Sequence, residues 1–184
     1  NLDRHVPPGK RPPSPAPIAR YLEQPKFYLR DANWSPDFPT SAQTILQFYN
    51  EEVKDGGKAS PMAIGEALPP RIDGVIAIMP EAVKPLLELT GPLLVDDQTF
   101  TAENLTDLLE YQVEIGFAHK GIPRPQRKEI ISKLGHALIA RILELPVEKW
   151  AEVLHIARTA LDEKQILLYG KDPELQSTIL QSGW

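Results

Sequence analysis

The stretch that decides the fold is DGVIAIMPEAVKPLLELTGPLLV, residues 73–95. Residues 75–79 are an apolar run, rich in β-branched side chains and bounded by glycine and proline, which predicts a strand buried on both faces. A helix from Pro80 to about Leu89 follows, and a second strand at residues 93–95 comes after a glycine that ends the helix. Strand, short helix and strand in this order are typical of a βαβ unit, so we expect two parallel strands with a right-handed connection.

Hydrophobic spacing on both sides of this stretch predicts further strands and a series of helices. The residues TSAQ at 40–43 match a capping box, which predicts that a helix begins at Thr40. Asp172 followed by Pro173 is typical of an N-cap with proline at the first helical position. The predicted strands are 26–30 and 165–169, and the predicted helices are 40–55, 101–116, 125–145, 147–164 and 173–181. The expected fold class is therefore α/β or α+β, with a central mixed sheet covered by helices.

Proline is concentrated at the start of the chain, where residues 7–17 read PPGKRPPSPAP. Because proline lacks an amide donor and fixes φ, this segment is excluded from helices and central strands. We expect an extended, proline-rich N-terminal strap. The chain is accordingly divided into a proline-rich lead-in, residues 1–25, and a single α/β domain, residues 26–184.

The composition is that of a globular protein, with 184 residues of which 42% are hydrophobic and 24% charged. A formal net charge of −5 argues against a dedicated nucleic-acid binder, which usually needs an excess of lysine and arginine. The chain has no cysteine, so disulfides and cysteine-based zinc sites are excluded. No apolar run approaches the roughly 20 residues of a membrane-spanning helix.

The first candidate site is the stretch FYLRDANWSPDFP, residues 27–39. Asp31, Asn33 and Asp37 carry the oxygen ligands that Mg²⁺ prefers, so Mg²⁺ is the cofactor that this cluster could hold. The calcium-loop pattern is not met, because serine and proline stand where it needs an Asx residue and glycine. The competing interpretation is turn chemistry, in which Asp37 precedes a helix N-terminus, where a carboxylate is favourable.

The second candidate site is a concentration of positive charge between residues 118 and 141. Its cations are Lys120, Arg124, Arg127, Lys128, Lys133 and Arg141, and Glu129 is the only acidic residue in the segment. Arg124, Arg127 and Lys128 crowd a predicted helix start, where the macrodipole makes cations unfavourable. Residues that are locally unfavourable, such as cations at a helix N-terminus, often mark functional sites. The free N–H groups of a helix N-terminus, together with arginine side chains, bind phosphate or pyrophosphate. His119 could add a titratable donor.

The competing interpretation of this charge is a solvated basic face that pairs with an acidic stretch of the same chain. The acidic residues of that stretch are Asp96, Asp97, Glu103, Asp107, Glu110 and Glu114. His136 and His155 lie among apolar residues of predicted helices, and we expect them to be packed or surface residues rather than ligands. The sequence contains no nucleophile elbow, zinc-protease, P-loop or dinucleotide-binding motif.

Three stretches of the chain resemble a known family: FYLRDANWSPDFPTSA from Phe27, DGVIAIMPEAVKPLLELTGPLLVDDQTFTAENL from Asp73, and KDPELQSTILQSGW from Lys171. They are similar to bacterial envelope proteins catalogued as a domain of unknown function, number four thousand and twelve. The resemblance spans Phe27 to Trp184. It implies part of a larger extracytoplasmic domain, associated with the cell membrane through an anchor outside this chain.

Residues 73–95, and IPRPQRKEIISKLGHALIARIL at 122–143, also resemble the LytR-CpsA-Psr family. Members of that family transfer glycopolymers from polyprenyl-pyrophosphate carriers to the cell wall, using Mg²⁺ and arginines that hold the pyrophosphate. Arg124 and Arg127 match the family's arginine-rich helix start, with Lys128 where the family has glutamine. The resemblance implies a LytR-CpsA-Psr-like fold. The family's R-x-R element has no counterpart here, which leaves open whether the chain is an enzyme.

These features predict an extracytoplasmic, membrane-associated bacterial domain that binds a phosphorylated or polyprenyl-pyrophosphate-linked glycopolymer and no nucleic acid. The expected ligand-binding residues are Arg124, Arg127, Lys128, His119 and Asn33. If the domain is a transferase, Asp31 is the expected catalytic carboxylate. The alternative is a non-catalytic scaffold or binding module of a polysaccharide or cell-wall assembly system, which the missing R-x-R element and the proline-rich strap favour.

Overall fold

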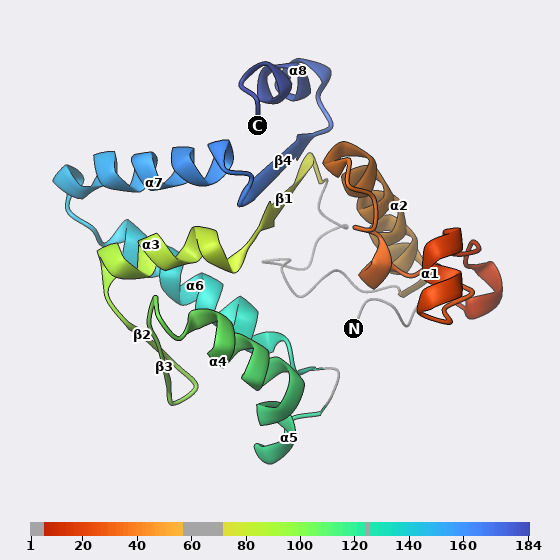
Figure 1. Ribbon diagram of the computed structural model, residues 1–184, viewed down its shortest axis with the longest axis horizontal. Helices are drawn as coiled ribbons and strands as arrows, with labels where there is room; N and C mark the ends of the chain where they lie inside the picture. The colour runs from red at the N-terminus through yellow and green to blue at the C-terminus, as the bar shows by residue number, and fades with distance from the viewer. Residues whose placement is uncertain (1–5, 57–71, 124–125) are drawn as a thin grey trace. The chain divides into compact units, whose positions relative to one another are not determined.

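The computed structural model describes residues 6–56, 72–123 and 126–184, and the expected mixture of helices and strands is confirmed (Figure 1). The longer helices are α1 (Ala16–Tyr21), α2 (Phe38–Gly56), α3 (Pro80–Thr90), α4 (Leu105–Tyr111), α6 (Glu129–Leu143), α7 (Trp150–Asp162) and α8 (Pro173–Gln181). A short α5 (Phe117–His119) follows a π-helical segment, Gln112–Gly116. The strands are β1 (Gly74–Ile78), β2 (Leu93–Val95), β3 (Gln98–Phe100) and β4 (Ile166–Gly170).

The chain divides into two compact units. The first unit comprises Asn1–Ile76 with Leu168–Gly183, and the second comprises Ala77–Leu167 with Trp184. The first unit therefore contains α1, α2 and α8, and the second contains α3 to α7 with the strands β2 and β3. In the described ranges, no helix is both long enough and apolar enough to cross a membrane.

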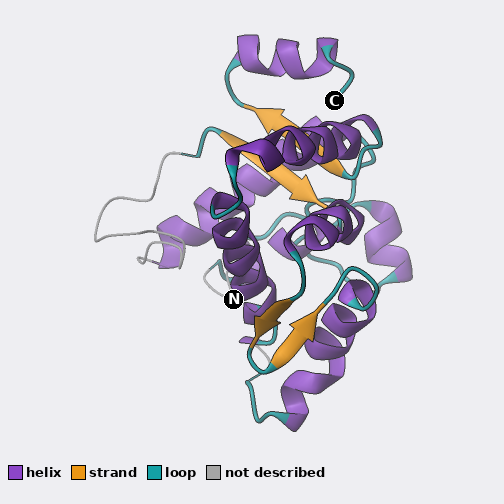
Figure 2. Ribbon diagram, turned by 90° about the vertical axis from the view of Figure 1, so that its left-hand side faces the viewer, coloured by secondary structure: helices purple, strands orange, loops and turns teal. Residues whose placement is uncertain are grey.

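The strands that the structure describes form two separate two-stranded sheets, β1–β4 and β2–β3, and both are antiparallel (Figure 2). The predicted parallel βαβ pair is therefore wrong. The reason lies in Asp96 and Asp97, which have φ angles of 47° and 63°. Positive φ at both central residues is the geometry of a two-residue hairpin turn. This turn reverses the chain direction directly after β2, so β2 pairs with β3.

The β1 strand is more exposed than predicted. Ile76 and Ile78 are 65% and 60% exposed, so the expectation of burial on both faces is wrong. Pairing with β4 extends beyond both ends of β1, because the Met79 N–H donates to the Gln165 carbonyl and the Lys171 N–H donates to the Asp73 carbonyl. Side chains of a strand point alternately to its two faces, so a strand that is packed on one face only has every second side chain exposed to solvent.

Helix α2 organises the first unit, and Phe27 meets Phe48 of this helix edge-on, with ring centroids 5.1 Å apart. The strand predicted around Phe27 is not formed. Lys26 makes an isolated antiparallel bridge with Pro13, and the 3₁₀-helix Leu29–Asp31 follows. The prolines of the facing segment supply no N–H groups for a ladder, which restricts pairing to a single bridge.

The proline-rich lead-in is attached to α2 by a buried ion pair between Arg11 and Glu52, whose side chains are 4% and 1% exposed. The Val6 N–H donates to the other carboxylate oxygen of Glu52 at 3.0 Å. The Arg11 guanidinium also lies over the Tyr28 ring, 4.3 Å from its centroid. The lead-in is therefore packed against the body of the first unit. The expectation that residues 7–17 form no helix is wrong, because a 3₁₀-helix spans Pro8–Lys10 and α1 begins at Ala16, where proline in the first turn costs no intrahelical hydrogen bond.

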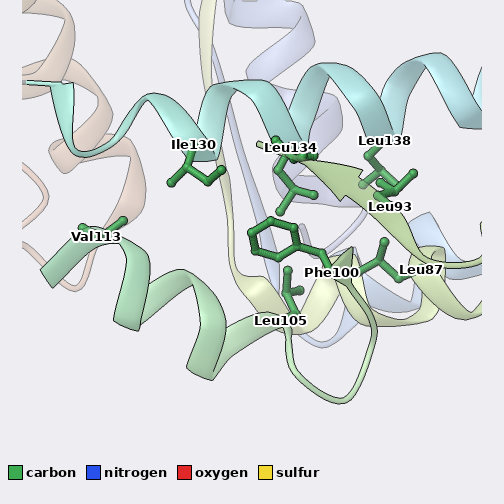
Figure 3. Packing of buried hydrophobic residues seen from close by; sticks show 9 residues of the cluster. Leu87, Leu93, Phe100, Leu105, Val113, Ile130, Leu134 and Leu138 are labelled. Carbon is green, nitrogen blue, oxygen red and sulfur yellow. The ribbon is translucent and has the colours of Figure 1, made fainter. Parts of the chain in front are cut away.

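The core of the second unit forms between the β2–β3 hairpin, α3, α4 and α6 (Figure 3). Its buried residues are Leu87, Leu93, Val95, Phe100, Leu105, Val113, Ile130, Leu134 and Leu138. Leu93 and Phe100 are register partners in the hairpin, and Phe100 is completely buried. Figure 3 shows the Phe100 ring between Leu105 and Leu134, so the hairpin positions one side chain against two helices.

Local helix signals are confirmed at two helix ends. Gly91 ends α3 with φ of 83°, and its N–H donates to the Leu87 carbonyl at 2.9 Å. The Asp172 side chain caps α8, accepting the N–H groups of Glu174 and Leu175 at 3.0 and 2.9 Å. Both interactions satisfy backbone groups that a helix end leaves without an intrahelical partner.

Candidate functional site

Asp31, the predicted catalytic residue, lies in the first unit at the end of the 3₁₀-helix rather than at the end of a strand. One of its carboxylate oxygens is 3.8 Å from Arg30 Nε, and its side chain is 19% exposed. The Arg30 guanidinium lies 4.1 Å from the centroid of the Tyr28 ring, the ring that Arg11 also contacts. Asp31 therefore belongs to a cluster of charged and aromatic side chains that packs the loop before α2.

The other two members of the predicted cluster differ in their surroundings. Asn33 is exposed, and Asp37 is the N-cap of α2. The Asp37 carboxylate accepts the backbone N–H of Thr40 at 3.0 Å and also its hydroxyl. The hydrogen bond from the Thr40 hydroxyl, followed by that from its backbone N–H, lowers the pKa of Asp37. The predicted capping box at Thr40 is thus wrong, whereas the helix-entry role of Asp37 is confirmed.

The Mg²⁺ prediction concerns Asp31, Asn33 and Asp37, which lie in the loop before α2 and at its N-cap. Across the parts of the chain that the structure describes, no three histidine or acidic side chains gather in a way that could hold a metal ion. Asp37 already uses its carboxylate as a helix cap. The turn-chemistry interpretation therefore accounts for Asp37, and Mg²⁺ remains a prediction for Asp31 and Asn33.

The basic segment lines a pocket of about 150 Å³ in the second unit, beside the first turn of α6. The lining residues are Asp96, Gln112, Phe117, Lys120, Ile122, Gln126, Arg127, Glu129, Ile130 and Lys133. Three of these are cations and two are acids. Gln112 is buried and contributes an amide at the wall of the pocket, where its Nε2 donates to Gln98 Oε1 at 3.4 Å.

The cations of this pocket are paired with acidic residues of the same unit. Arg127 Nη1 donates to Glu114 Oε2 at 3.1 Å, and Lys133 Nζ donates to Asp96 Oδ2 at 2.6 Å. Lys120 Nζ lies 3.4 Å from the backbone oxygen of Asp96. The predicted pairing between the basic segment and the acidic stretch is therefore confirmed. Because these ion pairs are partly exposed, each contributes only about 0–1 kcal/mol and can be exchanged for another anion at little cost.

Arg127 is the one predicted ligand-binding residue that lines this pocket among those described. Arg124 lies outside the described residues. Lys128 is an exposed residue at the N-cap of α6 and does not line the pocket. His119 Nδ1 lies 3.2 Å from the Tyr111 hydroxyl, within hydrogen-bond distance, and is also outside the lining.

Sequence reasoning did not select Lys120, Lys133 and Gln112 as site residues. The two lysines were part of the basic segment, and within α6 the three-residue spacing of Ile130 and Lys133 places both on one face of the helix. One helix face therefore presents both the core residue Ile130 and the cation Lys133. Gln112 lies in the π-helical segment, and no sequence pattern indicated that segment.

The arrangement contains groups that can bind a small anion. Lysine ammonium and arginine guanidinium groups converge on one pocket, and both form charge-assisted hydrogen bonds with phosphate oxygens. The first turn of α6 adds the positive end of a helix dipole, although Glu129 partly offsets it. The Arg127 guanidinium also lies 6.0 Å from the centroid of the Phe117 ring, which limits the positions that its side chain can take.

Comparison with known proteins gives a family but no characterised relative. No curated protein and no solved structure matches the chain. The family model described as "Protein of unknown function (DUF4012)" matches residues 3–113, which include most of the lead-in, α2, the β2–β3 hairpin and α4. The match covers more than half of the chain, and the chain therefore belongs to this family.

Proposed function

We propose that this chain is an extracytoplasmic, membrane-associated domain of a bacterial cell envelope that binds a phosphorylated ligand in the pocket beside α6. The ligand class is a phosphorylated or polyprenyl-pyrophosphate-linked glycopolymer. The observation that carries the proposal is the convergence of Lys120, Arg127 and Lys133 on one pocket in a chain of net negative charge. The more distant resemblance to the LytR-CpsA-Psr family supplies the identity of the ligand class.

The size of the pocket supports recognition of the anionic head of such a ligand. A volume of about 150 Å³ corresponds to roughly five water molecules, since one water occupies about 30 Å³ of the liquid. A phosphate or pyrophosphate group fits this space, while a glycan and a lipid chain would extend into solvent. The phosphate oxygens would replace Glu114 and Asp96 as the partners of Arg127 and Lys133.

The proposed ligand could also be a substrate, in which case the domain would be a transferase that transfers the glycopolymer to an acceptor hydroxyl. In such a transferase Asp31 would activate the acceptor hydroxyl, and cationic side chains would neutralise the charge that develops on the phosphate oxygens. Asp31 belongs to the first unit and Arg127 to the second, so each role is supported by its own surroundings only. Binding is therefore the better supported half of the proposal.

The alternative is a non-catalytic scaffold or binding module of a polysaccharide or cell-wall assembly system. The specific observation in its favour is that Arg127 and Lys133 already have carboxylate partners. The lead-in, buried against Glu52, would then serve as a structural element of the module.

Calorimetric titration with geranyl pyrophosphate, a short and soluble polyprenyl pyrophosphate, tests the proposal. We expect binding to the wild type, and at least about tenfold weaker binding to the double variant Arg127→Ala/Lys133→Ala, because charge-assisted hydrogen bonds are lost. Arg141→Ala is the matched control, since it removes an exposed cation from α6, the helix of Lys133, outside the pocket. Equal affinities for the wild type and the double variant would remove the phosphate-binding proposal and leave the scaffold.

A further inference from the structure

A second pocket of about 260 Å³ lies in the second unit along α3 and the end of α7. Its lining residues are Glu81, Ala82, Pro85, His155, Ile156, Thr159, Ala160, Glu163 and Gln165. Ala82 and Ala160 are both 2% exposed, so two small side chains from different helices form part of its floor. Short side chains where two helices meet leave a hollow that larger ones would fill. With Pro85 and Ile156 the floor is mainly apolar.

The rim of this pocket has the opposite charge to the pocket beside α6. Glu81 of α3 and Glu163 after α7 are its formal charges, His155 is a further titratable group, and no lysine or arginine belongs to the lining. Lys84 lies 3.9 Å from Glu81 across an exposed helix turn, a separation that provides only weak pairing. Gln165 Nε2 donates to Glu163 Oε2 at 2.7 Å and holds that carboxylate at the pocket.

Helix ends add to the preference for positive charge. Glu163 is the C-cap of α7, and the negative end of the α7 dipole lies beside it. The first turn of α3 carries the opposite partial charge, which Glu81 in that turn offsets. The carboxylates and the α7 terminus together favour a cation, while the floor provides apolar contact below it.

We propose that this pocket binds a primary ammonium group carried on a short apolar stem, the chemistry at the end of a lysine side chain. The ammonium has three N–H donors and no acceptor, which suits a rim of carboxylate oxygens from Glu81 and Glu163. The methylene groups of the stem would pack on Ala82, Ala160 and Ile156 and leave water. This site goes beyond the proposed function, because its ligand has the opposite charge and its residues are different.

The test uses n-butylammonium as the probe and n-butanol as its neutral counterpart, in NMR titrations of the whole chain. We expect n-butylammonium to shift the amide signals of Ala82, Ile156 and Thr159, and n-butanol to do so at least about fivefold more weakly, because it lacks the charge. Nα-acetyl-lysine methylamide, titrated in parallel, distinguishes a lysine side chain of a partner from a free amine. Binding of either amine in this pocket supports the proposal.

The variants Glu81→Gln and Glu163→Gln remove one negative charge each from exposed positions and are expected to weaken n-butylammonium binding about fivefold or more. Glu148→Gln is the matched control, an exposed acid of the second unit that does not line the pocket. Equal binding of n-butylammonium and n-butanol, unchanged affinity in both pocket variants, or no shift at these amides would each overturn the ammonium site.

Discussion

Arg11 and Glu52 form an ion pair that is almost completely buried and joins the proline-rich lead-in to α2. Residues 41 positions apart in the sequence are brought together by this contact. A buried ion pair adds little net stability compared with apolar residues of similar size, but removal of one partner leaves an uncompensated charge. The pair therefore makes the first unit sensitive to changes at either residue.

Glu52→Gln is expected to destabilise the first unit by about 3 kcal/mol, because it removes the charge of one member of a buried ion pair. Unfolding in urea measures this change when it is followed by tryptophan fluorescence in a Trp150→Phe/Trp184→Phe background, in which Trp34 of the first unit is the remaining tryptophan. Glu51→Gln, the same substitution one position earlier at a partly exposed site, is the control and should change stability by less than about 1 kcal/mol. Equal effects of the two substitutions would show that the Arg11–Glu52 contact does not hold the lead-in.

Phe100 and Leu94 provide a second matched pair, on opposite faces of the β2–β3 hairpin. Phe100→Ala is expected to cost about 3–5 kcal/mol, because Phe100 is completely buried between α4 and α6. Leu94 is 70% exposed, so Leu94→Ala should change stability by less than about 0.5 kcal/mol. Thermal unfolding monitored by circular dichroism compares the two variants. A large loss for Leu94→Ala would contradict the hairpin register.

The cap of α2 predicts a specific dependence on pH. Hydrogen bonds from Thr40 lower the pKa of Asp37 in the folded chain from its ordinary value of 3.8. Stability from this cap is therefore fully present above that value and is lost as the pH falls through the lower, folded pKa. Asp37→Ala should have a lower melting temperature than the wild type at pH 7, and the difference should disappear in strong acid. Asn33→Ala, at an exposed site four residues earlier, should show no such difference at either pH.

Two glycines are expected to respond in opposite directions to the same substitution. Gly91 ends α3 with φ of 83°, a conformation that L side chains rarely adopt, so Gly91→Ala should destabilise the second unit by roughly 1 kcal/mol. Gly135 lies inside α6 with open space where a Cβ would be placed, so Gly135→Ala should stabilise it by about 0.5–1 kcal/mol. Chemical denaturation measures both values. Changes of the same sign would contradict the assigned backbone conformations.

The ends of helices could be predicted from the sequence, because they are determined by residues close to one another along the chain. The stop at Gly91 and the cap at Asp172 depend on residues within one turn of each other. Strand pairing depends on contacts between distant segments, and the turn at Asp96 and Asp97 lacks the glycine that usually marks a tight hairpin. The sequence pattern for β2 was therefore recognised, while its partner β3 was not.

In the candidate site, too, the contacts between distant segments could not be predicted from local sequence patterns. A basic segment and an acidic stretch were both recognisable, and their pairing was foreseen as one alternative. The particular partners Arg127–Glu114 and Lys133–Asp96 depend on how the hairpin and the π-helical segment pack against α6. Asp31 directly follows the predicted strand 26–30, but this strand does not form because proline in the facing segment prevents a ladder of hydrogen bonds.

The most direct test of the account compares Glu114→Gln with Arg127→Ala in calorimetric titrations with inorganic pyrophosphate at low ionic strength. Glu114 competes with the anion for the Arg127 guanidinium, so the account predicts that Glu114→Gln binds pyrophosphate more tightly than the wild type. Arg127→Ala should bind it at least about tenfold more weakly, because a charge-assisted contact is lost. Affinities that are the same in both variants and the wild type would contradict the phosphate-binding pocket beside α6.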